Sequence, residues 1–321
     1  MTRPSAVPPP VTAVLDASSR WLPARLGEVE DLLREQAVGY GELLGADVAT
    51  TLAAGGKRLR PLLVLLCAGP AGGEGAVRAA AAIELVHMAT LVHDDVLDDA
   101  PLRRGLPTIS ACSGRARATA VGDLLFARAF ALLAEHEEAR PVALLAAASV
   151  SLAEGELAQR QDAFDTGISE QRYLDRCRLK TATLFECACL LARDLPALGA
   201  FGVQVGLAFQ LLDDVLDVAG PPERTGKARG TDLLDGTVTL PLIAAAEADP
   251  AIREADLRAL DAAAAERLCD RIAATGALDR VRSRALDMVA AAKAQLNADA
   301  YDAEQRQLLG LVADGVVQRY S

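Results

Sequence analysis

Two copies of one acidic motif carry the first chemical signal in this chain. The motif DDVLD stands at Asp94–Asp98, after an apolar segment, and again at Asp213–Asp217, after a second apolar segment. On a helix, the first and last aspartates of each copy are four residues apart and share one face. Three neighbouring carboxylates repel one another, and the C-terminal end of a helix disfavours negative charge. We therefore expect both copies to bind cations.

The cation that fits this pattern best is a hard divalent ion. Proteins hold Mg²⁺ through one or two carboxylates and leave the remaining positions to substrate phosphates and water. Two acidic helix faces would thus hold a diphosphate through a metal cluster. A solvated acidic helix end is the alternative for one isolated copy, but the repetition argues against it. An EF-hand calcium site is excluded because neither copy has the D-x-D-x-D-G spacing.

Basic residues beside glycine or inside apolar segments indicate phosphate recognition. Glycines let the backbone approach an anion closely, and Lys and Arg supply charge and hydrogen-bond donors. For any one of these side chains, an ordinary charged surface is the alternative interpretation. The candidates are Lys57, Arg58 and Arg60 in GGKRLRP, the pair Arg103 and Arg104, Lys180 beside Thr181 in CRLKTATLF, and Lys227 in GKARGTD.

Composition favours helices and a reducing environment. Hydrophobic residues make up 51% of the 321 residues but aromatic residues only 3%, so the apolar residues are mainly Ala, Leu and Val, as is common in all-α proteins. The net charge of −11 argues against binding nucleic acid or an anionic membrane through overall charge. The six cysteines form no CxxC pair, which predicts free thiols in the cytoplasm rather than disulfides or a zinc site.

Helical patterns follow one another along the chain, and no useful length alternates like a strand. We expect a disordered Pro-rich tail over residues 1–17 and a single all-α domain over residues 18–321. The N-terminus has no apolar core of the signal-peptide type. The predicted helices are Trp21–Leu44, Asp47–Ala68, Gly75–Ala100, Ser113–Glu135, Pro141–Gln161, Ser169–Arg193, Pro196–Ala219, Leu240–Ala248, Glu254–Thr275, Leu278–Ala300 and Ala303–Arg319.

One segment has nearly the composition of a membrane span. Leu195–Leu212 carries no charge over 18 residues, the lower end of transmembrane length. It contains one Pro, three Gly and two Gln, and it runs directly into Asp213. We predict a buried helix inside a bundle, and no transmembrane segment.

Taken together, these motifs resemble the trans-polyprenyl diphosphate synthase family. The resemblance runs from about Gly55 to Ile243 and more loosely beyond. It rests on GGKRLRP, HDDVLD followed by RRG, the KT pair, FQLLDDVLD, and the GK…GTDL…TLPLI segment, in the family's order. It implies a bundle of long antiparallel helices around a central active-site cavity, an isoprenoid synthase-like fold, usually as a homodimer. It also implies Mg²⁺-dependent elongation of an allylic diphosphate by isopentenyl diphosphate, with Mn²⁺ as a possible substitute.

The resemblance also implies a role for individual residues. Metal binding falls to Asp94, Asp98 and Asp213, completed or supported by Asp95, Asp214 and Asp217. Isopentenyl diphosphate is assigned to Lys57, Arg60, His87 and Arg104. The allylic substrate is assigned to Arg103, Lys180, Thr181, Gln210 and Lys227, of which Lys180, Thr181 and Gln210 also face the allylic cation. His87 lies seven residues before Asp94, on the same helical face. Thr237 is a departure, because many relatives carry Lys there.

Product length is predicted from two small residues. Short-chain relatives commonly carry a bulky aromatic residue at the position of Ala89, whereas this chain has Ala89 and Thr90. We therefore predict a geranylgeranyl or longer product. The alternatives are a short-chain farnesyl or geranyl diphosphate synthase, and a non-catalytic subunit of a heteromeric synthase. A terpene cyclase fits poorly because it binds one diphosphate and has no use for GGKRLRP.

Overall fold

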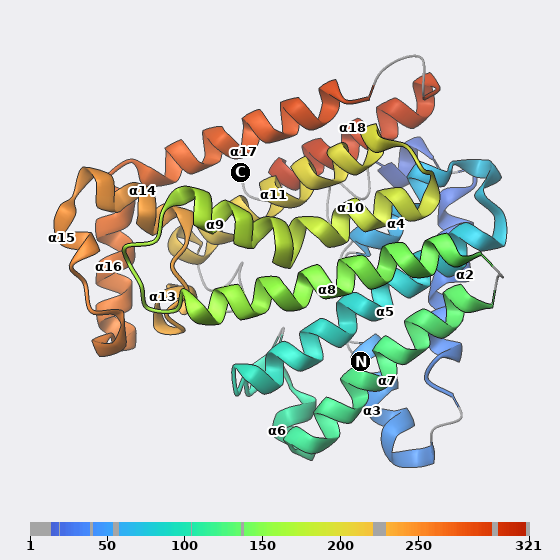
Figure 1. Cartoon of the computed structure of the whole chain (residues 1–321), viewed down its shortest axis with the longest axis horizontal. Helices are drawn as coiled ribbons and strands as arrows, with labels where there is room; N and C mark the ends of the chain where they lie inside the picture. Colours follow the sequence, from blue (N-terminus) through green and yellow to red (C-terminus); the bar gives the residue numbers. More distant parts are fainter. Residues whose placement is uncertain are drawn as a thin grey trace. The chain divides into compact units, whose positions relative to one another are not determined.

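The computed structural model describes residues 14–18, 20–38, 41–53, 58–103, 105–135, 138–220, 229–296 and 301–318. Within these ranges the protein is helical apart from one short hairpin, so the predicted all-α class is confirmed (Figure 1). The chain divides into two compact units whose segments interleave along the sequence. Unit 1 is Met1–Ser149, Leu184–Gly199 and Leu296–Gly315; unit 2 is Val150–Thr183, Ala200–Gln295 and Val316–Ser321.

Unit 1 is built around α5. This helix packs against α2, α4 and α7, and its alanines 79–82 are all buried. Ala lets neighbouring helices approach α5 closely on several sides. The elements of unit 1 are a helical turn at residues 14–17, α2 (Leu22–Glu35), α3 (Gly41–Ala53), α4 (Leu59–Ala68), η1 (Pro70–Gly72), α5 (Gly73–Leu97), β1 (Leu102–Arg103), β2 (Leu106–Pro107), α6 (Ile109–Ser113), α7 (Arg115–Ala134), nearly all of α10 (Thr183–Ala192) and most of α18 (Ala303–Gln318). Helix α8 (Ala139–Gln161) begins here and continues into unit 2.

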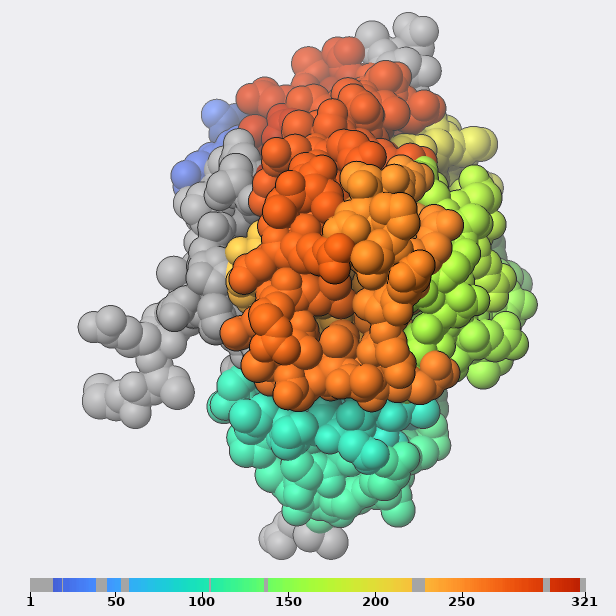
Figure 2. Space-filling view, turned by 90° about the vertical axis from the view of Figure 1, so that its left-hand side faces the viewer, coloured from blue at the N-terminus to red at the C-terminus, as the bar shows by residue number. Residues whose placement is uncertain are grey.

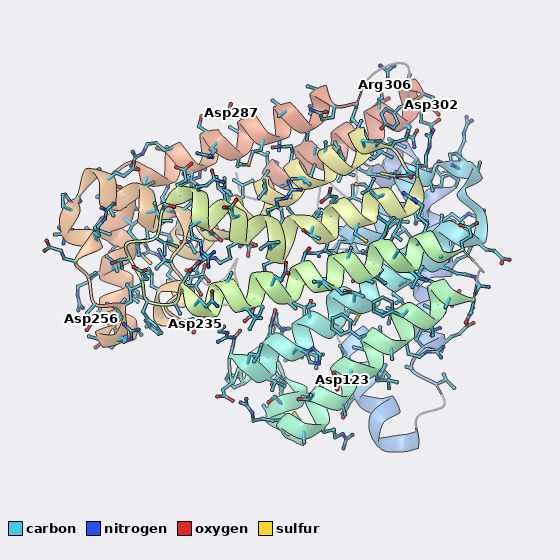
Figure 3. All side chains as sticks on the ribbon, in the orientation of Figure 1. Asp123, Asp235, Asp256, Asp287, Asp302 and Arg306 are labelled. Atoms are coloured by element: carbon cyan, nitrogen blue, oxygen red, sulfur yellow. The ribbon has the colours of Figure 1, made fainter. Side chains whose placement is uncertain are left out.

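Unit 2 contains the second acidic motif and a layer of shorter helices. Helix α14 packs against α9, α15, α16 and α17, and Figure 2 shows the segments α14 to α17 in orange on one face. Aspartate and serine side chains start several of these elements; Asp256, labelled in Figure 3, accepts the backbone N–H of Arg258 at 3.0 Å. The elements are α9 (Glu170–Cys177), η2 (Arg178–Ala182), most of α11 (Pro196–Ala219), α13 (Thr231–Leu234), α14 (Leu240–Ala248), α15 (Pro250–Arg253), η3 (Leu257–Ala259), α16 (Ala262–Ala274) and α17 (Ala277–Ala294).

Several predicted helices are wrong in their continuity. Trp21–Leu44 ends at Glu35, and Asp47–Ala68 is divided between α3 and α4. The second break is seen at Arg58, whose left-handed φ of 47° is not helical and which immediately precedes α4. Ser169–Arg193 contains a π-helical turn at η2, and the first part of Glu254–Thr275 is a 3₁₀ turn before α16.

The ends of the predicted domain also differ in detail. Residues 14–17 are helical and Val14 is only 1% exposed, so helical structure begins before the predicted tail boundary at residue 17. The remainder of the predicted tail lies outside the described residues. The two-residue strands β1 and β2 pair antiparallel around Gly105 and are too short to be recognised by alternation. The assignment of residues 18–321 to one domain stays a prediction.

Three helical segments are long and apolar enough to cross a membrane, judged by length and composition. They are Pro70–Leu97, Ala139–Gln161 and Pro196–Ala219. The most apolar parts of the first and third are 72% and 67% buried, which agrees with the burial predicted for Leu195–Leu212, whereas that of α8 is 22% buried. The predicted absence of a transmembrane segment stays a prediction.

Candidate active site

The first acidic motif closes α5 and turns its middle aspartate inward. Asp95 is 6% exposed, whereas Asp94 is half-buried and Asp98 is exposed. The guanidinium Nε of Arg103, on β1, donates a hydrogen bond to Asp95 Oδ1 at 2.8 Å. This contact gives the buried carboxylate a counter-charge, as burial of an ionised group requires. The two aspartates of the predicted metal-binding face remain at the surface.

The second acidic motif, near the end of α11, repeats this arrangement with different partners. Asp214 is 2% exposed, Asp213 is exposed and Asp217 is half-buried. The hydroxyl of Tyr173, on α9, donates to Asp214 Oδ2 at 2.5 Å, and the amide of Gln210 donates to Oδ1 at 2.8 Å. Burial and the nearby charge of Asp232 raise the pKa of Asp214 well above its usual range, against the lowering effect of these hydrogen bonds.

Gln210 links Asp214 to the KT pair within unit 2. Thr181 Oγ1 donates to Gln210 Oε1 at 2.7 Å, so both ends of the Gln210 amide are held. The structure therefore brings together Thr181, Gln210 and Asp214, which the family resemblance had assigned separately to the substrate and to the metal. Asp217 accepts the backbone N–H of Asp232 at 3.2 Å.

Lys180 lies in the π-helical turn, an element that is frequent at functional sites. Its Nζ contacts Glu156 Oε2 of α8 at 2.5 Å. Helix α8 comes this close because Gly155 has no side chain: a Cβ there would lie 2.5 Å from the backbone nitrogen of Lys180. The net effect of Lys180 and Arg160 is to lower the pKa of Glu156, although burial opposes this.

Arg60, in the first turn of α4, is the basic residue of unit 1 with the most unusual surroundings. Its guanidinium carbon lies 4.7 Å from the centre of the Phe185 ring of α10. Burial lowers the Arg60 pKa to about 10, although the charge of Glu84 opposes this shift. Among the described residues, its buried Nε has no hydrogen-bond partner. A half-buried cation whose buried Nε has an unused N–H is suited to receive an anionic ligand.

The other predicted site residues divide into described and undescribed positions. His87 and Thr90 lie half-buried on α5, where the Thr90 hydroxyl donates to the His87 carbonyl at 2.7 Å, and Ala89 is fully buried. The backbone N–H of Thr237 donates to the Asp232 carbonyl at 2.8 Å. Lys57, Arg104 and Lys227 lie outside the described residues.

Three residues that the structure places next to the predicted ones were not predicted from the sequence: Glu84, Glu156 and Tyr173. Arg58, a predicted phosphate-binding candidate, contacts Glu30 and Glu84 instead. A signal existed for the two glutamates, because each is an acidic residue inside a long apolar helix. Nothing local distinguishes Tyr173, whose partner Asp214 is 41 residues away.

The acidic motifs fit a hard divalent cation by their donor chemistry. Each provides carboxylate oxygens four residues apart at the end of an apolar helix, with the middle aspartate held inside its own unit. Within the described ranges, no three His, Cys, Asp or Glu side chains gather closely enough to hold a metal by themselves. Such incomplete sets are usual for Mg²⁺, which takes further oxygens from substrate phosphates and water.

Comparisons with known proteins identify the class. The polyprenyl synthetase family model matches residues 42–273. Heptaprenyl diphosphate synthase component 2 of Geobacillus stearothermophilus is 44% identical over 67% of this chain and 70% of its own length. Geranylgeranyl diphosphate synthase of Methanosarcina mazei is 33% identical over 83% of this chain and 86% of its own.

A solved structure supports the same class. The polyprenyl synthase of Caulobacter crescentus CB15, complexed with calcium and isoprenyl diphosphate, has a TM-score of 0.88 at 35% identity, covering 99% of this chain and all of that one. The chain therefore belongs to the polyprenyl synthetase family, the trans-polyprenyl diphosphate synthases, and has the isoprenoid synthase fold of its structural relatives.

Proposed function

We propose that this prenyltransferase joins isopentenyl diphosphate to an allylic diphosphate and releases pyrophosphate. The observation that carries the proposal is the shared pattern of the acidic motifs: each buries its middle aspartate and leaves one outer aspartate exposed and the other half-buried. The same carboxylate face is thus prepared twice, as binding of a diphosphate through metal ions requires. Arg60 supports a second diphosphate, because its half-buried guanidinium, with an unpaired Nε, lies outside both motifs.

The metal would be held by Asp94, Asp98 and Asp213, with Asp95, Asp214 and Asp217 in completing or supporting roles. We propose Mg²⁺, with Mn²⁺ as a substitute; the Caulobacter crescentus relative holds calcium. When bound, the metal neutralises charge that develops on the departing pyrophosphate. The hydrogen bonds from Arg103 to Asp95 and from Tyr173 to Asp214 keep the acidic faces in place before the substrate arrives.

Residues of unit 2 would stabilise the allylic carbon. As the allylic C–O bond breaks, positive charge develops on the hydrocarbon, and oxygen dipoles stabilise it. Gln210 is suited to this role because its bonds to Thr181 and Asp214 prevent the amide from rotating. Arg103, Lys180 and Lys227 would hold the allylic diphosphate, and Thr237 supplies no charge where many relatives have Lys.

The second substrate completes the reaction. Lys57, Arg60, His87 and Arg104 would hold isopentenyl diphosphate while its double bond forms the new C–C bond. The proton lost in restoring the double bond passes to the released pyrophosphate. Ala89 and Thr90, one turn or slightly more before Asp94, favour a product of geranylgeranyl length or longer. Relatives that make geranylgeranyl and heptaprenyl diphosphates support this range.

Two alternatives are distinguished by experiment, the first by activity of the purified chain alone and the second by product length. The name of the Geobacillus stearothermophilus relative, component 2, suggests a subunit of a heteromeric synthase. A short-chain synthase is the other alternative. We propose instead a homodimer active by itself in the cytoplasm. The free state of all six cysteines supports this location.

Product analysis tests the proposal directly. Purified protein is incubated with Mg²⁺, isopentenyl diphosphate and each allylic diphosphate in turn, and the product lengths are measured by mass spectrometry. We expect chains of geranylgeranyl length or longer, lost in excess chelator and lowered by orders of magnitude in Asp94→Ala and Asp213→Ala. Full turnover in chelator would exclude the metal assignment, and a farnesyl end product would exclude the predicted length.

A further inference from the structure

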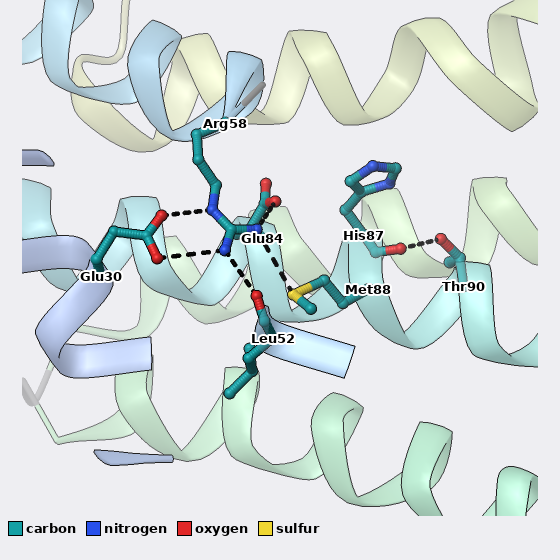
Figure 4. A network of polar contacts seen from close by, with 7 residues as sticks. All are labelled: Glu30, Leu52, Arg58, Glu84, His87, Met88 and Thr90. Atoms are coloured by element: carbon teal, nitrogen blue, oxygen red, sulfur yellow. Dashed lines mark hydrogen bonds and ion pairs between the residues drawn. The ribbon is translucent and has the colours of Figure 1, made fainter. Parts of the chain in front are cut away.

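Arg58 lies inside the substrate-binding segment GGKRLRP, yet its side chain is fully engaged by the protein. Its Nε donates to Glu30 Oε1 at 2.5 Å and its Nη2 to Glu30 Oε2 at 3.2 Å. Its Nη1 donates to Glu84 Oε1 at 2.8 Å, and Nη2 also reaches the Leu52 carbonyl at 3.1 Å. Figure 4 shows Arg58 between these groups, and its Nη1 also contacts the Met88 sulfur at 3.9 Å. This guanidinium has little capacity left for a substrate phosphate.

The contacts join three helices to the start of a fourth. Glu30 lies on α2, Leu52 on α3 and Glu84 on α5, while Arg58 immediately precedes α4. The backbone of Arg58 is left-handed, a conformation that costs energy for a residue with a Cβ. Burial lowers the Arg58 pKa, but its bonds to Glu30 and the charge of Glu84 outweigh this effect and raise it overall. The side-chain contacts therefore compensate for an unfavourable backbone at this position.

Glu84 is the residue that connects Arg58 to Arg60. Its side chain is 4% exposed, and its charge acts on both arginines. Arg58 forms a hydrogen-bonded ion pair with Glu84, whereas Arg60 has no hydrogen bond to it among the described residues. The buried Glu84 carboxylate thus acts on two cations but forms a hydrogen-bonded ion pair only with Arg58. Arg60 keeps its donors and its charge for another anion.

We propose that Arg58 is a positioning residue that occupies Glu84 and so keeps Arg60 available for the diphosphate of isopentenyl diphosphate. Without Arg58, the Glu84 carboxylate would be buried without this partner, and Arg60, on which its charge already acts, would pair with it. Arg60 would then exchange its substrate contact for an internal ion pair. The identity of the diphosphate in this inference rests on the proposed function. The competition of the two arginines for Glu84 does not.

The test is a double-mutant comparison at positions 58 and 84. Arg58→Ala keeps the Cβ and therefore the same backbone strain, so it removes only the side-chain contacts. We expect it to raise the KM for isopentenyl diphosphate about tenfold and to leave the KM for farnesyl diphosphate within about twofold. Arg58→Ala combined with Glu84→Gln should recover most of the lost affinity, because the competing carboxylate is gone. Glu84→Gln alone should leave that KM unchanged or lower.

A purely structural role makes the opposite prediction for the double variant. Arg58→Ala would then raise both KM values alike, and adding Glu84→Gln would restore nothing; either result overturns the proposal. If Arg58→Ala does not fold, Arg58→Lys replaces it in the same comparison, with a smaller rise expected in the same parameter. Arg78→Ala is the matched control, because it removes ion pairs with Glu74 and Glu135 from the other end of α5.

Binding without turnover separates this inference from the proposed function. Calorimetric titration of isopentenyl diphosphate into the wild type and the variants compares affinities directly. A wild type that elongates no allylic diphosphate contradicts the proposed function, whatever the variants do. A wild type that elongates normally, with equal affinity in Arg58→Ala, contradicts only the role of Arg58.

Discussion

At the scale of single residues, the middle aspartates of the two motifs are held by contacts that an exposed carboxylate would not need. Asp214 is almost completely buried and accepts hydrogen bonds from Tyr173 and Gln210. A buried polar group without partners is costly, so each donor contributes to stability. The same reasoning predicts that buried hydroxyls with and without a partner respond differently to removal.

Tyr173→Phe removes only the hydroxyl that donates to Asp214. We expect a loss of about 1–3 kcal/mol in the free energy of unfolding, because the buried carboxylate keeps one side-chain donor instead of two. Urea denaturation measures this change. Tyr301→Phe is the matched control, since the Tyr301 hydroxyl is buried with no hydrogen-bond partner in the described chain. Equal losses in the two variants would show that the bond to Asp214 contributes nothing.

The six cysteines should differ sharply in reactivity. Cys112 is exposed and the other five are buried. Burial raises the pKa of Cys187 to about 12 and that of Cys269 to about 11, and the thiolate is the reactive form. Titration of the native protein with a thiol reagent at about pH 8 should therefore detect one fast thiol per chain. Cys112→Ser should abolish it, and a second thiol reacting at the same rate would contradict the burial.

At the scale of elements, a single glycine sets the approach of α8 to the π-helical turn. Gly155→Ala would place a Cβ within 2.5 Å of the backbone nitrogen of Lys180. We expect a loss of about 1–3 kcal/mol in stability and a higher KM for the allylic substrate, because Lys180 must move with its backbone. Thermal unfolding and steady-state kinetics measure both effects.

Gly75→Ala is the control for this prediction. It lies in α5 with no heavy atom within 4 Å of the added Cβ, so the substitution should be neutral or slightly stabilising. If Gly155→Ala also leaves stability and kinetics unchanged, the close approach of α8 to Lys180 has no functional importance.

Helix α5 also carries the predicted limit on product length. One helical turn rises about 5.4 Å, comparable to one isoprene unit, so a bulky residue one turn before Asp94 should stop the growing chain. Ala89→Phe should shorten the product relative to the wild type, as measured by mass spectrometry. Ala89→Ser, which stays small, should leave the length unchanged. An unaltered product in Ala89→Phe would place the growing chain elsewhere.

At the scale of the whole molecule, the exposed apolar face of α8 predicts self-association. Val150 and Leu157 are 59% and 63% exposed and lie seven residues apart, on one face of the helix. Exposed apolar patches commonly mark interfaces. We expect a homodimer by light scattering and a monomer in Leu157→Glu. Leu286→Glu is the control: Leu286, on α17, is 50% exposed, and its substitution should leave the dimer mass unchanged. A monomeric wild type would contradict the prediction.

Features that depend on local pattern could be predicted from the amino-acid sequence. Composition and apolar periodicity were enough to predict an all-α chain, and the four-residue spacing within each DDVLD was enough to place its outer aspartates on one helical face. The positions of the helix breaks were less well predicted. A break such as that before α4 depends on a left-handed Arg58, which is stable only when Glu30 and Glu84 are near.

The contacts of each charged residue could not be predicted from local pattern, because they depend on how the helices pack. The two acidic motifs are identical in sequence, yet Asp95 pairs with Arg103, eight residues away, and Asp214 with Tyr173, 41 residues away. Arg58 and Arg60 are two residues apart, but the guanidinium of Arg58 is bound by two carboxylates and that of Arg60 lies over the Phe185 ring. Burial and pairing depend on which helices pack together. This packing brings together residues far apart in the sequence, and the local sequence around each one does not predict its partner.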